Sequence, residues 1–239
     1  MFKIVNFLKR FFDSNEELED LVIGSSITKK VKILIDNGHG SGTKGKRSPY
    51  SANKIEPAFD FYEYAWNREI ARNIVTQLLS SGYDAELLVP EEYDVSLSER
   101  VKRVNKHCDR LGKNNVIVVS IHANACGNGN KWEKAYGWEA YTSVGQTESD
   151  YIAEIFYKNA EEIFYDRRIR YDLTDKDKDR EVSFYILKYT KCPAILTENF
   201  FYDNIDDIQF ILSENGKEKI IDLHVKSIIQ YVKEKEKGE

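Results

Sequence analysis

Short apolar runs alternate along this chain with longer segments whose apolar residues recur at helical spacing. The run at 115–122 (NVIVVSIH) is apolar over most of its length, as is typical of a strand covered on both faces. Residues 66–79 instead repeat large apolar side chains every four positions, which predicts the buried stripe of a helix. Alternation of this kind favours a mostly parallel sheet with helices on both faces.

The same two patterns predict the remaining elements. Strands are expected at 31–36, 85–89, 115–122, 137–142 and 194–198, and helices at 66–79, after Ser96, at 152–164 and at 221–232. Ser96-Leu-Ser-Glu99 has the form of a capping box, in which each side chain bonds a free backbone amide of the first turn. We therefore expect an α/β fold whose mostly parallel central sheet has about six strands.

The composition is that of a single globular domain. The chain has 239 residues, of which 41% are hydrophobic and 31% charged, and no repeat or linker divides it. We interpret residues 30–239 as the domain and residues 1–29 as an N-terminal extension. The extension begins MFKIVNFLKRFF, whose apolar residues have helical spacing, so we expect an amphipathic helix there. Packing against the domain is the simpler interpretation of that helix, and binding to a membrane surface is the alternative.

Charge and apolar content exclude several classes of protein. The 35 Lys and Arg against 40 Asp and Glu give a net charge of −5, which argues against a general nucleic-acid binder. No apolar run approaches the about 18 residues of a membrane span. Lys9 and Arg10 interrupt the N-terminal apolar stretch, so we predict no ordinary signal peptide and a cytoplasmic location at synthesis. Three scattered cysteines indicate no disulfide framework, and a monomer is the simplest expectation.

Polar residues stand at the carboxyl ends of three expected strands. They are Asp36-Asn-Gly-His39 after the first strand, Ser120-Ile-His122-Ala-Asn124 on the central strand and Thr197-Glu198-Asn199 on the late strand. Sites in parallel sheets form beyond the carboxyl ends of the strands, so we expect His39, His122 and Glu198 to meet at one edge. Two imidazoles and one carboxylate are a ligand set of catalytic zinc sites, and a separate carboxylate is then needed to move the proton.

The residues alone leave the third ligand open. Asp60, Glu63 and Glu69 lie before or within the start of the long helix, and of these Glu63 can turn into a site from the helix start. Simpler interpretations also exist, because a histidine at a strand end can be a capping or surface residue. Glu198 could likewise form a buried ion pair with an unidentified lysine or arginine.

Several sequence blocks, in order, resemble the zinc-dependent N-acetylmuramoyl-L-alanine amidases of the type called amidase 3. They are Ile35-Asp-Asn-Gly-His39-Gly40, Glu63 with Asn67, Leu97 with Arg100 and Asn105, Ser120-Ile-His-Ala-Asn-Ala125, Gly137 with Glu139 and Tyr141, and Pro193-Ala-Ile-Leu-Thr-Glu198. The resemblance covers residues 31–231. It implies that His39, Glu63 and His122 bind Zn²⁺ and that Glu198 is the catalytic carboxylate. The implied substrate is peptidoglycan, cut at the amide between N-acetylmuramic acid and the L-alanine of the stem peptide.

Two stretches depart from the family pattern. Ser41–Pro49 is a basic loop containing Lys44, Lys46 and Arg47, where the family has Gly-x-Asp-x-Gly. This loop could attract the carboxylates of stem peptides, or it could simply be solvated. The second departure is Phe200, which stands where the family has a glycine in a tight backbone turn.

Within this interpretation we expect Arg47, Asn124 and Asn199 to contact the substrate. The protein would act at the cell wall or periplasm after release or export, and host remodelling and phage lysis are both compatible with that location. Two other functions stay open. One is a zinc peptidase of related fold that cuts a peptide bond, and the other is a cell-wall binding module without activity.

Overall fold

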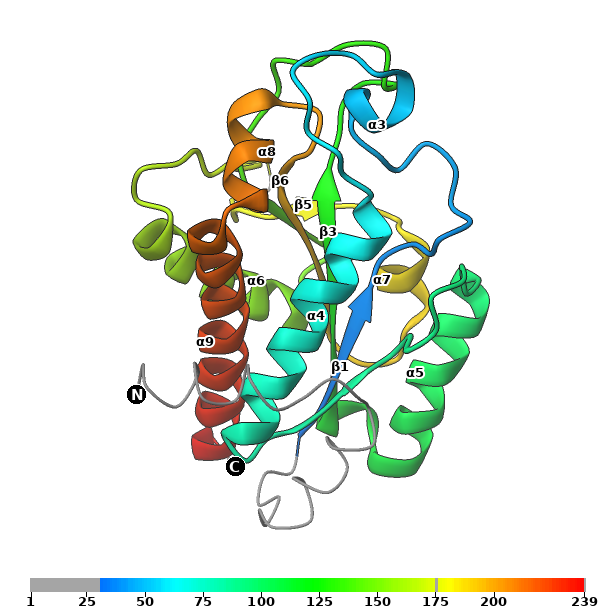
Figure 1. Cartoon of the computed structure of the whole chain (residues 1–239). Helices are drawn as coiled ribbons and strands as arrows, with labels where there is room; N and C mark the ends of the chain where they lie inside the picture. The colour runs from blue at the N-terminus through cyan, green and yellow to red at the C-terminus, as the bar shows by residue number, and fades with distance from the viewer. Residues whose placement is uncertain (1–30, 175, 239) are drawn as a thin grey trace.

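The computed structural model describes residues 31–174 and 176–238 (Figure 1). The strands are β1 (Lys32–Asn37), β2 (Asp84–Leu87), β3 (Val116–Asn124), β4 (Glu139–Thr142), β5 (Arg180–Glu181) and β6 (Ala194–Phe201). The helices are α3 (Pro49–Asn53), α4 (Glu63–Ser80), α5 (Leu97–Leu111), α6 (Glu148–Ile163), α7 (Tyr185–Tyr189), α8 (Ile205–Leu212) and α9 (Glu214–Gly238), with a short 3₁₀ turn at Lys113–Asn115. The amphipathic helix predicted within residues 1–29 lies outside the described residues.

The strands form one sheet in the order β2-β1-β3-β6-β4-β5. The first four in this order run parallel, β4 is antiparallel to β6, and β5 is parallel to β4. The predicted α/β fold with a mostly parallel sheet is confirmed. Two predicted strands are shifted or shortened at their ends, since the second spans Asp84–Leu87 and the fourth Glu139–Thr142.

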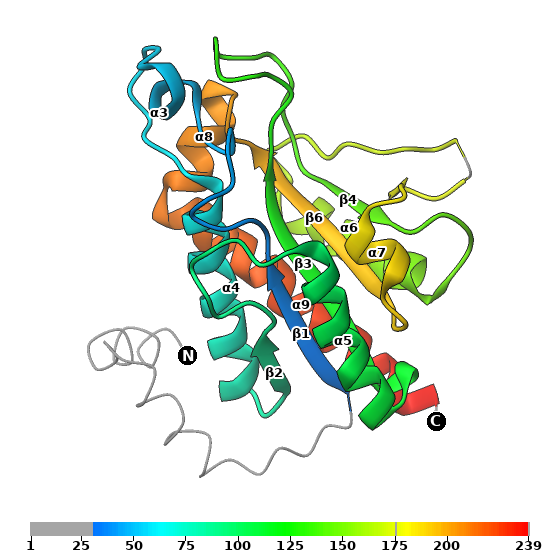
Figure 2. The same cartoon turned by 90° about the vertical axis from the view of Figure 1, so that its right-hand side faces the viewer.

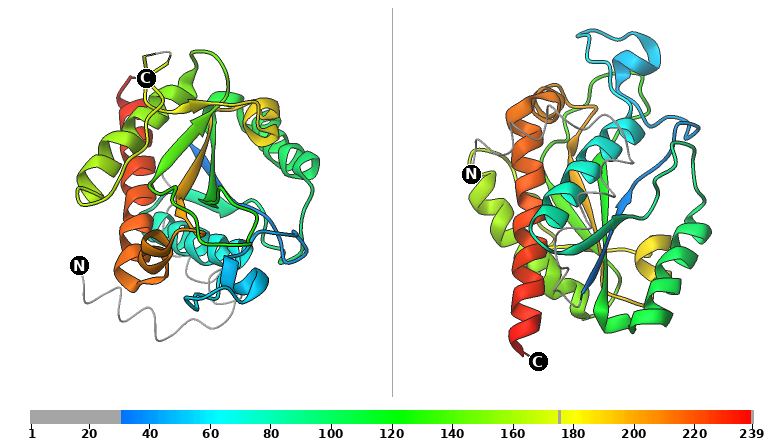
Figure 3. Two further views of the ribbon diagram at one scale, coloured as in Figure 1. Left: turned by 90° about the horizontal axis from the view of Figure 1, so that it is seen from above. Right: turned by 60° about the horizontal axis from the view of Figure 1, so that its bottom comes forward.

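Helices cover both faces of the sheet (Figures 2 and 3). Alternate residues of β1 explain this: Ile33 and Ile35 join a core with α4, α6 and α9, whereas Leu34 joins a second core with α5 and α7. β1 and β3 are buried on both sides, which is why their sequences are almost continuously apolar.

The predicted capping box at the start of α5 is only half formed. Oγ of Ser96 accepts the backbone N–H of Glu99 at 3.3 Å, but the Glu99 carboxylate accepts from Arg103 instead of the Ser96 amide. A complete box starts α6, where the Thr147 hydroxyl and the Asp150 carboxylate cap each other's backbone amides. Glu99 is half-buried and has two basic neighbours on its own helix, so ion pairing displaces the reciprocal cap.

The sheet brings three strand ends to one edge of the molecule (Figure 1). Asp36 of β1 lies beside Ser120 of β3, and His122 of β3 lies beside Glu198 of β6. The register between β3 and β6 shifts just beyond His122, and the strands pair again at Asn124 and Phe201, so an irregularity of the sheet lies beside the polar residues. No helix among residues 31–174 and 176–238 is long and apolar enough to span a membrane.

Candidate metal and catalytic site

Two imidazoles and a carboxylate converge at this edge of the sheet. Nδ1 of His122 lies 3.0 Å from Oε1 of Glu63, and Nε2 of His39 lies 3.3 Å from the same oxygen. One ligand atom from each residue lies within 4.8 Å of those of the other two. The two rings meet edge to face with their centroids 4.9 Å apart. The strand ends predicted that His39 and His122 lie together, and the family resemblance predicted Glu63 beside them; the structure brings all three side chains together.

The backbone around β1 and α4 explains how these side chains meet. His39 follows the end of β1 and has φ 65°, a left-handed conformation that turns the chain sharply. The preceding Gly38 leaves room for the His122 ring, because a Cβ there would lie 2.1 Å from Cε1 of that ring. Glu63 is the first residue of α4 and is fully buried.

The structure distinguishes among the three acidic candidates near the start of α4. Asp60 accepts a hydrogen bond from the Ser51 hydroxyl, away from the histidines. Glu69 points outward and pairs with Lys217 at 2.7 Å. Glu63 alone of these three reaches both imidazoles.

The donor set fits a zinc ion. Ligands about 2.1 Å from a tetrahedral ion lie about 3.4 Å from one another, close to the 3.0 and 3.3 Å separations found here. The second oxygen of Glu63, Oε2, is buried and accepts no hydrogen bond, although burial of a carboxylate oxygen normally requires a partner. Two nitrogen donors and one carboxylate oxygen form a site with room for a further ligand.

The three groups are linked electrostatically. Burial opposes ionisation of Glu63, but its hydrogen bonds with His122 and His39 outweigh burial and hold the carboxyl pKa well below its usual range. Burial likewise opposes protonation of His122, yet Glu63 raises the pKa of that imidazole. For His39 burial prevails, and its pKa is lowered. Glu63 is therefore ionised at neutral pH, as a metal ligand must be.

Glu198 lies beside this cluster on β6. Burial raises the pKa of its carboxyl to about 8, and the charge of Glu63 acts in the same direction. Its Oε2 is buried and accepts no hydrogen bond. Within the described residues the carboxylate forms no ion pair, so the predicted alternative of a buried pair with a lysine or arginine has no support in the structure.

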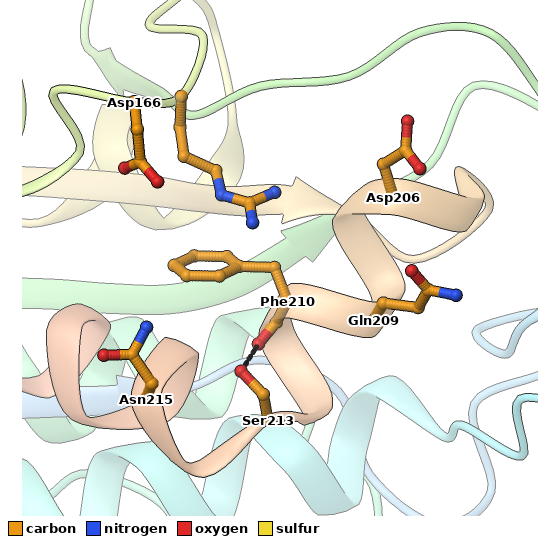
Figure 4. Close-up of a pocket in the computed structure, with 7 residues that line it drawn as sticks. Asp166, Asp206, Gln209, Phe210, Ser213 and Asn215 are labelled. Carbon is orange, nitrogen blue, oxygen red and sulfur yellow. Dashed lines mark hydrogen bonds between the residues drawn. The ribbon is translucent and has the colours of Figure 1, made fainter.

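A cavity of about 380 Å³ opens over these residues. It is lined by His39, His122 and Glu198, by Lys46 of the basic loop, and by Phe184, Tyr185 and Ile186 at the start of α7. A second cavity, of about 490 Å³, lies between α8 and α9 (Figure 4). There the Arg167 guanidinium stacks 4.1 Å above the Phe210 ring, and no histidine or cysteine lines the space. The cavity of about 380 Å³, which contains both histidines and Glu198, is therefore the candidate active site.

Arg100 braces the turn that carries His39. The guanidinium is 2% exposed, pairs with Asp36 at 2.6 Å and donates to the carbonyl oxygens of Asn37 and His39. Asp36 in turn accepts from the Ser120 hydroxyl at 2.6 Å. The turn after β1 is thus held by α5 and β3 together.

The residues predicted to contact substrate occupy three different environments. The Arg47 side chain is exposed and does not line the cavity, whereas that of its neighbour Lys46 does. Asn124 is half-buried and donates to Glu139 at 2.7 Å. Asn199 is fully buried, and its amide bonds the His122 carbonyl and the Trp138 indole, which leaves it no atom for substrate. This geometry supports a positioning role for Asn199 instead.

Sequence reasoning missed the aromatic wall of the cavity. Phe184 and Tyr185 follow a strand of only two residues, β5, which has no recognisable pattern. The aromatic residues Phe61 and Trp66, near the start of α4, belong to the core instead. The sequence does contain a signal for this wall. Aromatic residues at 184, 185 and 189 lie shortly before the strand predicted at 194–198.

Phe200 adopts the backbone conformation expected of a glycine. Its φ is 67°, in the left-handed region, directly after the site strand residues Glu198 and Asn199. Such a conformation costs a non-glycine residue roughly 1–2 kcal/mol. The Phe200 ring is fully buried between Phe164 and Phe210, with both ring centroids 5.0 Å away, and this packing offsets the cost.

Comparison with known proteins identifies the family and agrees with the fold. The sequence profile of the family described as N-acetylmuramoyl-L-alanine amidase matches residues 33–230. The endolysin of Bacillus phage SPP1 is 26% identical over 211 residues, which are 86% of this chain and 68% of the phage protein. N-acetylmuramoyl-L-alanine amidase CwlM of Bacillus licheniformis is 29% identical over 185 residues, 77% of this chain and 61% of that protein.

A solved structure gives the same result. The N-acetylmuramoyl-L-alanine amidase from Clostridium difficile 630 superimposes with a TM-score of 0.69 and 25% identity, covering 86% of this chain and 98% of that one. The profile match spans most of the chain, and every block that carries the resemblance lies inside it. This chain belongs to the N-acetylmuramoyl-L-alanine amidase family.

Proposed function

We propose that the protein hydrolyses peptidoglycan at the amide between N-acetylmuramic acid and the L-alanine of the stem peptide. The observation that carries the proposal is the convergence of His39, Glu63 and His122, with Glu198 beside His122 in the sheet register. The family match supports the same activity. All of these residues come from one chain, which is consistent with a monomer acting at the cell wall after release or export.

His39, Glu63 and His122 would hold a zinc ion. When bound there, the ion would polarise the substrate carbonyl and increase the acidity of a water molecule. The remaining work falls to this chain's own groups. Arg100 and Gly38 keep the His39 turn and the His122 ring in place, and Asn199 fixes the His122 carbonyl at 2.9 Å.

Glu198 is the proposed general base and acid. A carboxyl whose pKa lies near the working pH both accepts a proton efficiently and returns it. In this proposal Glu198 takes a proton from the attacking water and delivers it to the leaving amine of L-alanine. Its position in the cavity wall, with Oε2 accepting no hydrogen bond from the protein, leaves that oxygen available.

Replacing Glu198 tests this mechanism. In Glu198→Gln we expect turnover to fall by about 10²–10⁴-fold, the usual contribution of a positioned general base. Zinc content should stay stoichiometric, because Glu198 is not one of the three proposed ligands. The measurement is mass spectrometry of peptidoglycan digests together with metal analysis. Activity equal to the unmodified protein would contradict the proposed role.

The same digests separate the competing functions. Stem peptides with a free L-alanine amino terminus, lost on chelation and restored by zinc, are the expected products. Peptide fragments cut internally would instead identify a zinc peptidase. Stoichiometric zinc without any product would indicate a cell-wall binding module.

A further inference from the structure

Three carboxylates meet near the end of β4, where the Thr142 hydroxyl contacts two of them. One carboxylate oxygen from each of Asp150, Asp177 and Asp179 lies within 4.8 Å of those of the other two. Asp150 comes from the first turn of α6, and Asp177 and Asp179 come from the segment that leads into β5. Asp150 and Asp179 are 6% and 1% exposed. Buried carboxylates so close together need a cation or a proton.

Neutral donors satisfy part of this charge: the Thr147 backbone N–H donates to Oδ2 of Asp150, and Nε2 of Gln146 donates to Oδ2 of Asp177 at 3.1 Å. Among the described residues neither Asp150 nor Asp179 forms an ion pair with a lysine, arginine or histidine. The Thr142 hydroxyl lies 2.6 Å from Oδ2 of Asp179 and 3.1 Å from Oδ1 of Asp150, but it has only one proton to donate. Oδ1 of Asp179 is buried and accepts no hydrogen bond. This unpartnered oxygen belongs to one of the three clustered carboxylates, whose side chain is almost completely enclosed.

Burial raises the pKa of Asp179 to about 7, and the charges of Asp177 and Asp150 add to the effect.

We propose that Asp150, Asp177 and Asp179 bind a divalent cation of the calcium class. Ca²⁺ accepts carboxylate and hydroxyl oxygens at about 2.3–2.6 Å in irregular arrangements, whereas Mg²⁺ demands a stricter octahedron and keeps more water. The arrangement suits Ca²⁺ because its ligands come from a helix start and an irregular segment. The Thr142 hydroxyl is positioned as an additional oxygen ligand.

The cation would brace the wall of the catalytic cavity. It would join the end of β4, the start of α6 and the segment at 176–179. That segment continues through β5 directly into Phe184 and Tyr185, which line the cavity over Glu198. A structural cation here is independent of the proposed zinc site, because none of its ligands is shared.

Terbium luminescence tests the proposal on the full chain. Tb³⁺ substitutes for Ca²⁺ and is excited through a nearby tyrosine, and Tyr157 lies close to Asp179. We expect saturable binding that Ca²⁺ displaces with a Kd of about 10⁻⁶–10⁻³ M and Mg²⁺ displaces much less effectively. Asp179→Asn should abolish it, whereas Asp166→Asn, which changes an exposed carboxylate elsewhere, should retain it. Glu63→Gln should also retain it, which separates this site from the proposed zinc site.

Thermal unfolding shows whether Asp179→Asn acts through the cation or through the fold. At pH 8 without Ca²⁺ we expect the variant to melt at the same temperature as the unmodified chain or higher, since it loses a buried negative charge. Added Ca²⁺ should raise the melting temperature of the unmodified chain only. Absence of binding up to millimolar Ca²⁺, or undiminished binding by Asp179→Asn, would overturn the proposal.

Discussion

At the scale of single residues, small differences in position decide which polar groups can take part in chemistry. Lys46 and Arg47 are neighbours in the basic loop, yet only the Lys46 side chain lines the cavity. Its Nζ lies 3.7 Å from Oε2 of Glu63, which is too long for a hydrogen bond, and the side chain is 42% exposed. Lys46 is therefore a cation that an incoming anionic group can reach.

We predict that Lys46 favours stem peptides with a free carboxylate on the residue after L-alanine. In Lys46→Met, kcat/KM for such a substrate should fall roughly two- to fivefold, the range for a partly exposed ion pair. The rate with the amidated analogue should change little. Steady-state kinetics on the two synthetic substrates measures this, with Lys44→Met in the same loop as the control. An equal loss on both substrates would instead place Lys46 in the chemical step.

His224 is a buried histidine that the fold holds in its neutral form. It is fully buried, its Nδ1 donates to the Ile220 carbonyl at 2.7 Å, and its Nε2 accepts from the Thr197 hydroxyl at 2.9 Å. Burial lowers the pKa of this imidazole to about 4. The neutral ring thus links α9 to the residue just before Glu198.

This lowered pKa predicts a pH dependence of stability. Because the folded pKa lies below the ordinary value of 6.5, the contribution is complete above pH 6.5 and is lost as the pH falls towards 4. The loss amounts to about 3 kcal/mol. Denaturant unfolding measures the free energy of unfolding between pH 7 and 4. This free energy should fall less steeply with decreasing pH in His224→Asn than in the control His107→Asn. Identical slopes in both variants would contradict the assignment.

At the scale of elements, the turn after β1 is where local geometry and site chemistry depend on each other. The turn at 38–40 packs closely against two groups. Gly38 lies against the His122 ring, and Gly40 lies against the backbone of Asp94. The turn can follow this path because β1 and β3 are held in register and Arg100 ties the turn to α5. Helix α5 therefore positions His39 of the proposed metal site without contributing a ligand.

A methyl group on Gly38 should break this arrangement. In Gly38→Ala the new Cβ would lie 2.1 Å from Cε1 of His122, so the imidazole must move away from Glu63. We expect zinc affinity to fall by at least about tenfold, with a matching loss of activity. Gly42→Ala is the matched control, because its Cβ would meet nothing within 4 Å. Competition with a chromogenic chelator measures both affinities, and equal affinities would contradict the steric argument.

At the scale of the whole molecule, the fold follows from the sequence more fully than the site does. Continuous apolar runs such as 115–122 and helical stripes such as 66–79 predict the layers, because burial on both faces leaves an unmistakable pattern. Polar residues at the carboxyl ends of the strands predict that His39 and His122 lie together, because the ends of parallel strands meet at one edge of the sheet. Glu63 and Lys46 lie outside strands, and their positions depend on long-range packing of the loop at 41–62. The pattern of the residues alone therefore left Glu63 among several candidates.

Metal binding should stabilise the whole fold, since its proposed ligands come from β3, α4 and the turn after β1. At free zinc of about 100 times Kd, mass action adds roughly 2.7 kcal/mol, or roughly 5–10 °C in melting temperature for a chain of this size. Chelation should reverse the shift. Calorimetry of the unmodified chain and of His39→Ala measures it, and the variant should show no shift. An equal response of both proteins to zinc would place the ion elsewhere.

The left-handed backbone of Phe200 restricts which substitutions homologous chains can accept at and around this position. A phenylalanine tolerates this conformation here because Phe164 of the segment after α6 and Phe210 of α8 enclose its ring. A chain with glycine at this position would lack the ring and would favour other neighbours. Exchanging one residue alone is therefore unfavourable in either direction, and the effects of the three positions cannot be additive. We therefore predict that homologues with glycine at position 200 differ together at 164 and 210, which an alignment of the family tests.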